Sequence, residues 1–220
     1  MNLIALNNTN TTQLKPKRST MTGKASRTAK PKTKAKSAEV ALKQNKTVDK
    51  PVQAKTSTTP KRLVNTKDLS REDWLQVRRQ GIGSSDAAAA CGIHPYLSML
   101  ELWMIKTGRM SSNIDESIEG YSPLYWGNTL EPMVAKYYQE HTGNKVRRVN
   151  AVLQHPNPDK AFMLANLDYA ITGNDEVQIL ECKTAGEHGA KLWKLGVPLY
   201  VTCQVQHQLA VTGKQAAHIC

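Results

Sequence analysis

The chain has 220 residues and a formal net charge of +12, and hydrophobic residues make up 40% of it. This length suits one domain with an additional tail. No run of about 18 apolar residues occurs, so the sequence predicts no transmembrane helix. The first residues lack the pattern of a signal peptide, and the four scattered cysteines form no C-x-x-C pair, which argues against a disulfide framework or a zinc site. We therefore expect a cytoplasmic protein.

The excess positive charge is confined to the first 62 residues. They contain 12 Lys and 3 Arg against Glu39 and Asp49, a net charge of +13, whereas residues 63–220 carry a net charge of −1. With no aromatic residue and little apolar periodicity, residues 1–62 are predicted to be a disordered basic tail. Two interpretations remain open: a solubilising linker, or an arm that binds DNA phosphates and whose deletion would flatten the salt dependence of binding.

A folded domain is predicted over residues 63–220, and its first half reads as helical. SREDWLQVRRQ predicts a short helix capped by Ser70, and GIGSSDAAAACG predicts a turn followed by a small-residue helix that ends at Gly92. HPYLSMLELWMIKTGRM predicts another helix. After a loop over residues 111–124, YWGNTLEPMVAKYYQEHTG predicts a long helix that closes at Gly143.

The second half changes to a strand pattern. KVRRVNAVLQHP, AFMLANLDYAIT and EVQILECKTA predict three strands, with a turn at residues 173–175 between the last two. YVTCQVQHQLAVTG predicts a helix, and KQAAHIC resembles the opening of another strand, so we expect that the C-terminal part of the domain is missing. This order predicts an α/β (α+β) fold with a mixed central β-sheet flanked by helices. The four tryptophans are expected in the core.

Two carboxylates and a lysine form the most informative pattern, D-(x)12-E-x-K. Glu181 and Lys183 are two residues apart, so on a strand both side chains point to the same face. The turn at residues 173–175 folds the two strands together and brings Asp168 roughly opposite Glu181. Because a buried charge is costly unless it is paired or bound to a metal, the pattern indicates a site. The alternative is an ion pair on a solvent-facing strand.

Two carboxylates and a backbone carbonyl are ligands that Mg²⁺ prefers. Such an ion activates water and stabilises charge on a phosphate, and Lys183 could orient or deprotonate the attacking water. Glu131, on the predicted long helix, is a possible third ligand or an ordinary surface residue. Gln204 and Gln208 share a helix face and could contact the metal shell or DNA, or form a plain polar surface.

Five motifs together resemble those of YqaJ-like viral recombinases. In chain order they are GIGSSDAAAACGIHPY, WGNTLEPMVAKYY, ANLDYAI, ILECKT and YVTCQVQHQLAVTG. These proteins are relatives of bacteriophage lambda exonuclease in the PD-(D/E)XK nuclease superfamily, and the resemblance covers roughly residues 70–220. It implies a PD-(D/E)XK restriction-endonuclease-like core. The proline–aspartate pair that names the superfamily is absent, because Asp168 follows Ala-Asn-Leu.

The resemblance implies a function and a role for each matching residue. The function is Mg²⁺-dependent hydrolysis of linear duplex DNA, 5′ to 3′, in recombination, with Mn²⁺ as a substitute ion. The metal ligands would be Asp168, Glu181, the carbonyl of Cys182 and Glu131, with Lys183 as the catalytic lysine and Gln204 beside it. A pocket for a terminal 5′ phosphate would use Ser85 with Arg78 or Arg79, which suits phosphate chemistry.

The implied partners are double-stranded DNA ends, a single-strand annealing protein and further copies of the chain, in a bacterial or phage-infected cell. Two other functions remain open. One is a site-specific endonuclease of the same superfamily. The other is a DNA-binding protein that has lost catalysis and works through its basic tail.

Overall fold

The computed structural model describes residues 4–7, 58–111 and 122–220. Most of the predicted tail and of the predicted loop at residues 111–124 therefore lies outside the described residues. Two parts of the tail prediction differ from the structure. Ile4–Asn7 form strand β1, and β2 begins at Lys61, so both ends of the basic segment belong to sheets.

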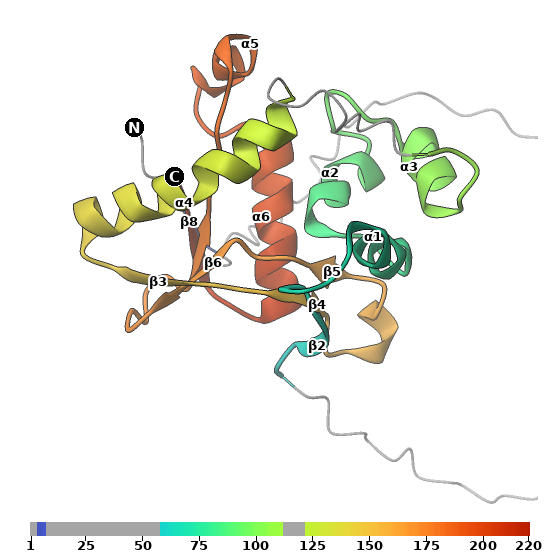
Figure 1. Ribbon diagram of the computed structural model, residues 1–220, viewed down its shortest axis with the longest axis horizontal. Coiled ribbons are helices and arrows are strands. Elements are labelled where there is room, and N and C mark those ends of the chain that lie inside the picture. Colours follow the sequence, from blue (N-terminus) through green and yellow to red (C-terminus); the bar gives the residue numbers. More distant parts are fainter. Residues whose placement is uncertain (1–3, 8–57, 112–121) are drawn as a thin grey trace, which may run out of the picture. The chain divides into compact units, whose positions relative to one another are not determined.

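Two β-sheets organise the fold (Figure 1). The larger sheet has the order β1-β8-β7-β6-β3, in which β7 and β8 run parallel and the other neighbours run antiparallel. The smaller sheet has the order β2-β4-β5 and is antiparallel. The strands are β1 Ile4–Asn7, β2 Lys61–Asn65, β3 Lys145–Arg148, β4 Ala151–Gln154, β5 Leu164–Ala165, β6 Tyr169–Thr172, β7 Ile179–Glu181 and β8 Ala216–Ile219.

Helices flank this framework, as expected. The α-helices are α1 Arg71–Arg79, α2 Ala87–Ala90, α3 Met99–Lys106, α4 Pro123–Thr142, α5 Glu187–Ala190 and α6 Leu199–Thr212. Short 3-10 helices span Ser84–Asp86, Pro158–Lys160 and Lys191–Trp193. The predicted mixed α/β fold is confirmed. In the part of the chain that the structure describes, we find no helix with the length and apolar character needed to cross a bilayer.

The predicted helix ends follow from local chemistry. The hydroxyl of Ser70 accepts the backbone N–H of Asp73 at the start of α1, which satisfies one of the free donors of a helix N-terminus. Gly143 ends α4 with a φ of 71°, a left-handed conformation in which a Cβ would be strained. Both predicted caps are therefore confirmed.

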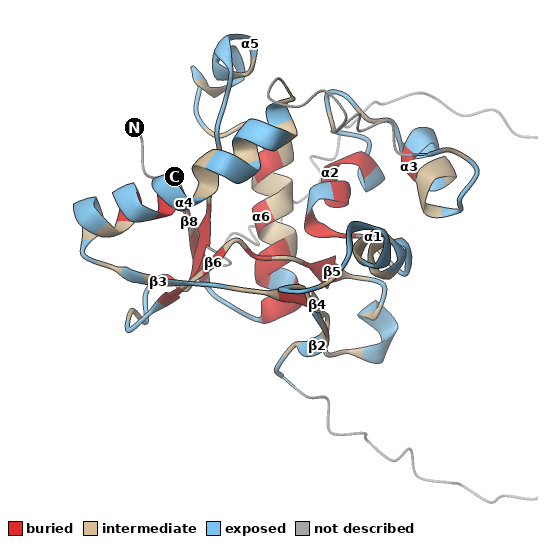
Figure 2. Ribbon diagram, in the orientation of Figure 1, coloured by how far each residue is buried: buried red, intermediate tan, exposed pale blue. Residues whose placement is uncertain are grey.

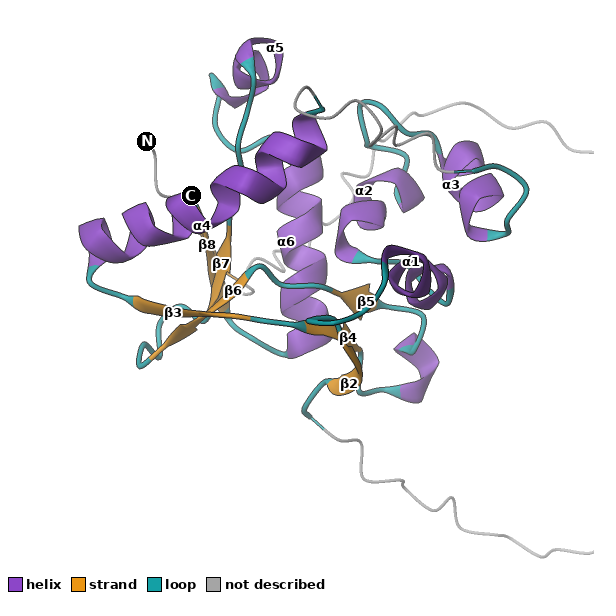
Figure 3. Cartoon of the chain, in the orientation of Figure 1, coloured by secondary structure: helices purple, strands orange, loops and turns teal. Residues whose placement is uncertain are grey.

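Two predicted strands are each broken in the middle (Figure 3). KVRRVNAVLQHP divides into β3 and β4, and AFMLANLDYAIT divides into β5 and β6. β3 and β6 belong to the five-stranded sheet, whereas β4 and β5 belong to the three-stranded sheet. The chain therefore leaves one sheet before it joins the other. The two breaks lie side by side, because the N–H of Val149 donates to the carbonyl of Asp168 at 3.2 Å. Asp168 thereby stands at the entrance of β6 and not inside a strand.

Buried residues line the strands and the helices that pack on them (Figure 2), and two apolar clusters cover the two faces of the five-stranded sheet. On one face Leu180 of β7 packs in a cluster with Tyr138 of α4, and on the other face Ile179 packs with Val205 and Leu209 of α6. Neighbouring residues of a strand point to opposite faces, so β7 contributes to both layers. The strand that carries Glu181 is therefore fixed by helices on both sides.

The prediction for the tryptophans is only partly right. Trp193 packs against the α6 cluster, but Trp103 and Trp126 are 50% and 48% exposed. Trp74 lines a cavity, as described below. An aromatic residue in an amphipathic helix predicts a buried face but not which neighbours cover it.

Candidate active site

The hairpin of β6 and β7 brings the two predicted carboxylates together. Tyr169 pairs with Leu180 and Ala170 with Ile179 in an antiparallel register. One step further along the same register, Asp168 lies opposite Glu181. The predicted juxtaposition of these two residues is therefore present, although Asp168 precedes its strand.

Glu181 is held by three side chains although it is almost fully buried, at 1% exposure. Its Oε1 forms an ion pair with Lys183 Nζ at 2.6 Å and accepts Gln204 Nε2 at 2.5 Å. Its Oε2 accepts Gln208 Nε2 at 2.7 Å. Both glutamines lie on the same face of α6, as predicted, and each donates to one oxygen of the carboxylate.

Asp168 is the most perturbed acid of this group. Its Oδ2 accepts the backbone N–H of Cys182 at 2.8 Å. Burial, followed by the charge of Glu181, raises the pKa of Asp168 well above its usual range, despite the opposing effect of Lys183. Two carboxylates in one buried place favour protonation of one of them.

For Lys183, the neighbouring negative charges outweigh the effect of burial on the pKa. Burial alone would lower its pKa, but the charge and hydrogen bond of Glu181, together with Asp168, raise the pKa of Lys183 above its usual value. The lysine therefore remains a cation beside the two acids. Its side chain is positioned as the D-(x)12-E-x-K pattern predicts.

A third carboxylate reaches the same place from α4. Burial raises the pKa of Glu131, and the nearby Arg148 opposes this shift. The Nη2 atom of Arg148 lies 3.2 Å from Glu131 Oε1, within ion-pair distance. This buried oxygen has no hydrogen-bond partner among the described residues, so the contact is electrostatic and lacks hydrogen-bonding orientation.

This donor set fits a hard divalent cation. Among the described residues, the three carboxylates of Glu131, Asp168 and Glu181 meet the cations Lys183 and Arg148, and Glu131 Oε1 has no hydrogen-bond donor there. Carboxylate oxygens are the ligands that Mg²⁺ prefers. Over the described ranges no three His, Cys, Asp or Glu side chains already stand in a metal-binding arrangement. Binding therefore requires the backbone carbonyl of Cys182 or a small shift of Glu131 or Glu181.

A second group of polar side chains comes from α1 and the following 3-10 helix. Arg78 Nη2 donates to Ser85 Oγ at 2.7 Å and to Asp86 Oδ1 at 2.9 Å. Arg78 lines the cavity that contains the carboxylates, whereas the exposed Arg79 does not. Of the two arginines that the sequence left open, the structure brings Arg78 to the site and leaves Arg79 away from it.

Asp86 fixes this group although the sequence did not single it out. It accepts the N–H of Gly83 at 2.9 Å and pairs with Lys106 Nζ of α3 at 2.6 Å. Burial opposes ionisation, but Arg78 and Lys106 outweigh it, and the pKa of Asp86 is lowered. The ionised carboxylate holds Arg78 in one orientation. The link to Lys106 connects distant segments, so no local signal could have revealed it.

Ser84 is a further residue that sequence reasoning missed. It is 4% exposed, and its Oγ has no hydrogen-bond partner within the part of the chain that the structure describes. It lines the same cavity as Arg78 and Ser85. A buried hydroxyl without a partner is costly unless a ligand supplies one.

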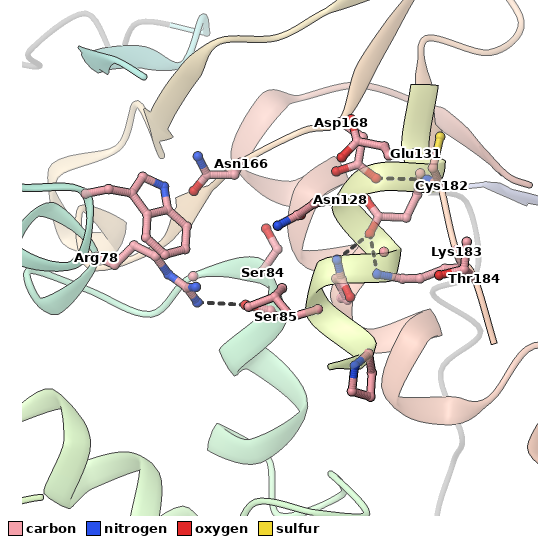
Figure 4. A pocket seen from close by; sticks show the side chains of 17 residues that line it. Arg78, Ser84, Ser85, Asn128, Glu131, Asn166, Asp168, Cys182, Lys183 and Thr184 are labelled. Carbon is pink, nitrogen blue, oxygen red and sulfur yellow. Dashed lines mark hydrogen bonds and ion pairs between the residues drawn. The ribbon is translucent and has the colours of Figure 1, made fainter. Parts of the chain in front are cut away.

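Both groups face one cavity of about 310 Å³ (Figure 4). Arg78, Ser84 and Ser85 lie on one side, and Asp168, Glu131 and Lys183 lie on the other. Its walls are completed by Trp74, Gly83, Pro123, Leu124, Gly127, Asn128, Asn166, Glu181, Cys182, Thr184 and Gln204. The sequence had singled out the charged members but not Asn128, Asn166 or Thr184.

Trp74 is part of the cavity and not of the core. The guanidinium of Arg78 lies 4.8 Å from the centre of its ring, and that of Arg71 lies 5.3 Å from it. These contacts stabilise the tryptophan at the surface of α1. The prediction that it is a core residue is wrong, because two arginines of its own helix cover the indole.

The comparisons with known proteins identify the family of this chain. The family model of the YqaJ-like viral recombinase domain matches residues 73–215. The uncharacterized protein YqaJ of Bacillus subtilis (strain 168) is 40% identical over 154 residues, which are 70% of this chain and 46% of that protein. This chain thus spans about half the length of that relative.

The fold also resembles that of a solved enzyme. The crystal structure of an alkaline exonuclease (LHK-Exo) from Laribacter hongkongensis matches with a TM-score of 0.50 and 23% identity, over 67% of this chain and 72% of the other. The structure of LHK-Exo in complex with dAMP matches equally well. The family match begins inside α1, covers the other elements up to the end of α6, and includes both sides of the cavity. The chain therefore belongs to the YqaJ-like viral recombinase domain family.

Proposed function

We propose that this protein is a Mg²⁺-dependent DNA exonuclease of the phage recombination type, which acts on linear duplex DNA from a 5′-phosphorylated end. One observation carries the proposal: the carboxylate–lysine group and the Arg78–Ser84–Ser85 group face each other in one cavity. A nuclease needs the first group for hydrolysis. An enzyme that starts at a DNA end needs the second to hold the terminal phosphate.

The acidic side of the cavity would hold the metal. Asp168, Glu181, Glu131 and the carbonyl of Cys182 would bind Mg²⁺, for which Mn²⁺ can substitute. When bound, the ion would supply activation of water and stabilisation of charge on the phosphate. Gln204 and Gln208 hold both oxygens of Glu181, so that the carboxylate keeps its direction.

Lys183 would act on the reacting phosphate. The charge of Glu181 keeps the ammonium protonated, and its Nζ lines the cavity beside Asp168. A fixed cation at this point can orient the attacking water and neutralise the charge that develops in the transition state. The ion pair with Glu181 keeps the flexible lysine side chain in place before DNA arrives.

The opposite side of the cavity would bind the terminal phosphate. Arg78 presents a guanidinium oriented by Asp86, and Ser84 offers a hydroxyl that has no partner among residues 58–111 and 122–220. Arg78 and Lys106 carry two positive charges against the one negative charge of Asp86. The resulting net positive charge suits an anion. LHK-Exo has been crystallised with dAMP, a nucleotide that carries such a phosphate.

The proposal is tested by digestion of linear duplex DNA with and without Mg²⁺. We expect nucleotide release only with Mg²⁺, faster from ends that carry a 5′ phosphate, while supercoiled circles remain intact. Cutting of circles at defined places would instead indicate a site-specific endonuclease. Tight DNA binding without any hydrolysis would indicate a binding protein and contradict the proposal.

Lys183→Ala tests the catalytic role directly. Loss of the cation should reduce the rate of digestion by about 10² to 10⁴-fold, a range typical of groups that act in the transition state. DNA binding should change little, because the exchange removes one of many positive charges. Lys191→Ala, an exposed lysine outside the cavity, is the matched control. A Lys183→Ala protein that digests DNA at the normal rate would refute the assigned role.

A further inference from the structure

A second cavity borders the first one at Asp168 and Glu131. It has a volume of about 540 Å³ and shares four wall residues with the first cavity: Trp74, Glu131, Asn166 and Asp168. Its remaining wall consists of Thr66, Lys67, Arg148, Val149, Asn150 and Leu167. Asp168 and Glu131, together with Trp74 and Asn166, therefore form the border between the two cavities.

Two segments that lie far apart in the sequence form the outer wall of this second cavity. The loop between β2 and α1 contributes Thr66 and Lys67, and the segment from the end of β3 to β4 contributes Arg148 and Asn150. The N–H of Thr66 donates to the carbonyl of Asn150 at 3.2 Å, which joins the two segments. The N–H of Lys67 also donates to Asn65 Oδ1 at 3.2 Å, so the loop is held in a defined turn.

Lys67 and Arg148 give the outer wall a positive charge. The side chain of Arg148 is 53% exposed, and one of its guanidinium nitrogens lies 3.2 Å from Glu131. Lys67 is exposed at the rim. Residues 63–220 carry a net charge of −1, so these two cations are a local feature and not part of a general positive field.

We propose that the second cavity binds the phosphodiester on the 3′ side of the bond that is hydrolysed, through Lys67 and Arg148. The inference rests on the proposed function. If the terminal 5′ phosphate lies against Arg78 and the reacting phosphate lies at Asp168 and Glu181, the strand must continue past these carboxylates. The second cavity begins at Asp168, and its cations match the charge of the next phosphate.

Binding measurements with short nucleotides test this subsite. Titration calorimetry on the full chain, with Ca²⁺ to screen the carboxylates, compares dAMP with a 5′-phosphorylated trinucleotide. We expect the wild type to bind the trinucleotide more tightly. Lys67→Ala should reduce that advantage by about fivefold and lower the salt dependence of trinucleotide binding by about one phosphate contact, while dAMP affinity stays as in the wild type.

Lys145→Ala is the matched control, since this exposed lysine lies on the same strand as Arg148 and lines neither cavity. It should keep the trinucleotide advantage. The inference fails if Lys67→Ala keeps the full advantage, or if dAMP binding weakens equally in that variant. It also fails if both lysine variants lose the advantage to the same extent.

Failure of the proposed function looks different. In that case the wild type would release no nucleotides from linear DNA with Mg²⁺, whatever the lysine variants bind. A wild type that digests DNA, combined with a Lys67→Ala protein that binds the trinucleotide normally, would remove the subsite alone.

Discussion

Asp168 shows how a buried acid can lower the stability of a fold. Burial and the neighbouring Glu181 raise its pKa in the folded protein above the value in the unfolded chain. The folded state therefore binds the proton more tightly. The stability that this provides is complete below the unfolded pKa and is lost as the pH rises through the folded pKa. At alkaline pH an ionised Asp168 destabilises the protein unless a cation binds beside it.

Asp168→Asn should therefore stabilise the protein in buffer with EDTA at pH 8. The amide removes the buried charge, and its oxygen can still accept the N–H of Cys182. We expect a gain of about 1–2 kcal/mol, which corresponds to an increase in Tm of about 3–6 °C for a chain of this size. Thermal unfolding at pH 5 and pH 8 measures the effect, and the gain should shrink at the lower pH.

Added Mg²⁺ provides the control for this prediction. Binding to the folded state should raise the Tm of the wild type, by mass action, and leave that of Asp168→Asn nearly unchanged. A variant that melts below the wild type at pH 8 in EDTA would show that the carboxylate is not a destabilising charge.

At the scale of elements, the turn after α1 holds the Arg78–Ser84 side of the cavity against the segment that leads into β5. The N–H of Ile82 donates to the carbonyl of Phe162 at 2.7 Å, and the N–H of Leu164 donates back to the carbonyl of Ile82 at 2.9 Å. A Cβ on Gly81 would lie 2.3 Å from the carbonyl oxygen of Phe162. Only a glycine allows this close approach of two backbones, and Arg78 and Ser84 lie on either side of it.

Gly81→Ala should consequently destabilise the fold by about 2–4 kcal/mol, because a backbone segment has to move. Chemical denaturation measures this as a lower midpoint. Gly189→Ala is the control, since its Cβ would meet only Ala185 Cβ at 3.7 Å, and alanine suits a helix better than glycine. Equal stability of Gly81→Ala and the wild type would show that the two segments do not require this approach.

The geometry of single strands and helices explains why part of the site could be predicted from the sequence. The register of one hairpin places Asp168 beside Glu181, and the spacing of one helix places Gln204 and Gln208 together, so periodicity was sufficient. The breaks between β3 and β4 and between β5 and β6 were not predicted. In AFMLANLDYAIT buried apolar residues continue through the break at Leu164, Leu167 and Tyr169, because both sheets bury their residues.

At the scale of the whole molecule, contacts between distant segments decided what the sequence left open. Arg78 differs from Arg79 because it lines the cavity and pairs with Asp86, which also pairs with Lys106 of another helix. Likewise Ile4–Asn7 pair with β8, although their sequence neighbours read as a basic tail. Such contacts depend on the packing of the complete fold, and no local pattern reports them.

The central claim is that one divalent cation is held where β6 and β7 bring their acids together. Anomalous diffraction from crystals soaked in Mn²⁺ tests it most directly. We predict a peak within about 2.0–2.6 Å of carboxylate oxygens of Asp168 and Glu181 and of the Cys182 carbonyl. A protein that digests linear DNA with Mn²⁺ but shows no peak between these residues would contradict the account.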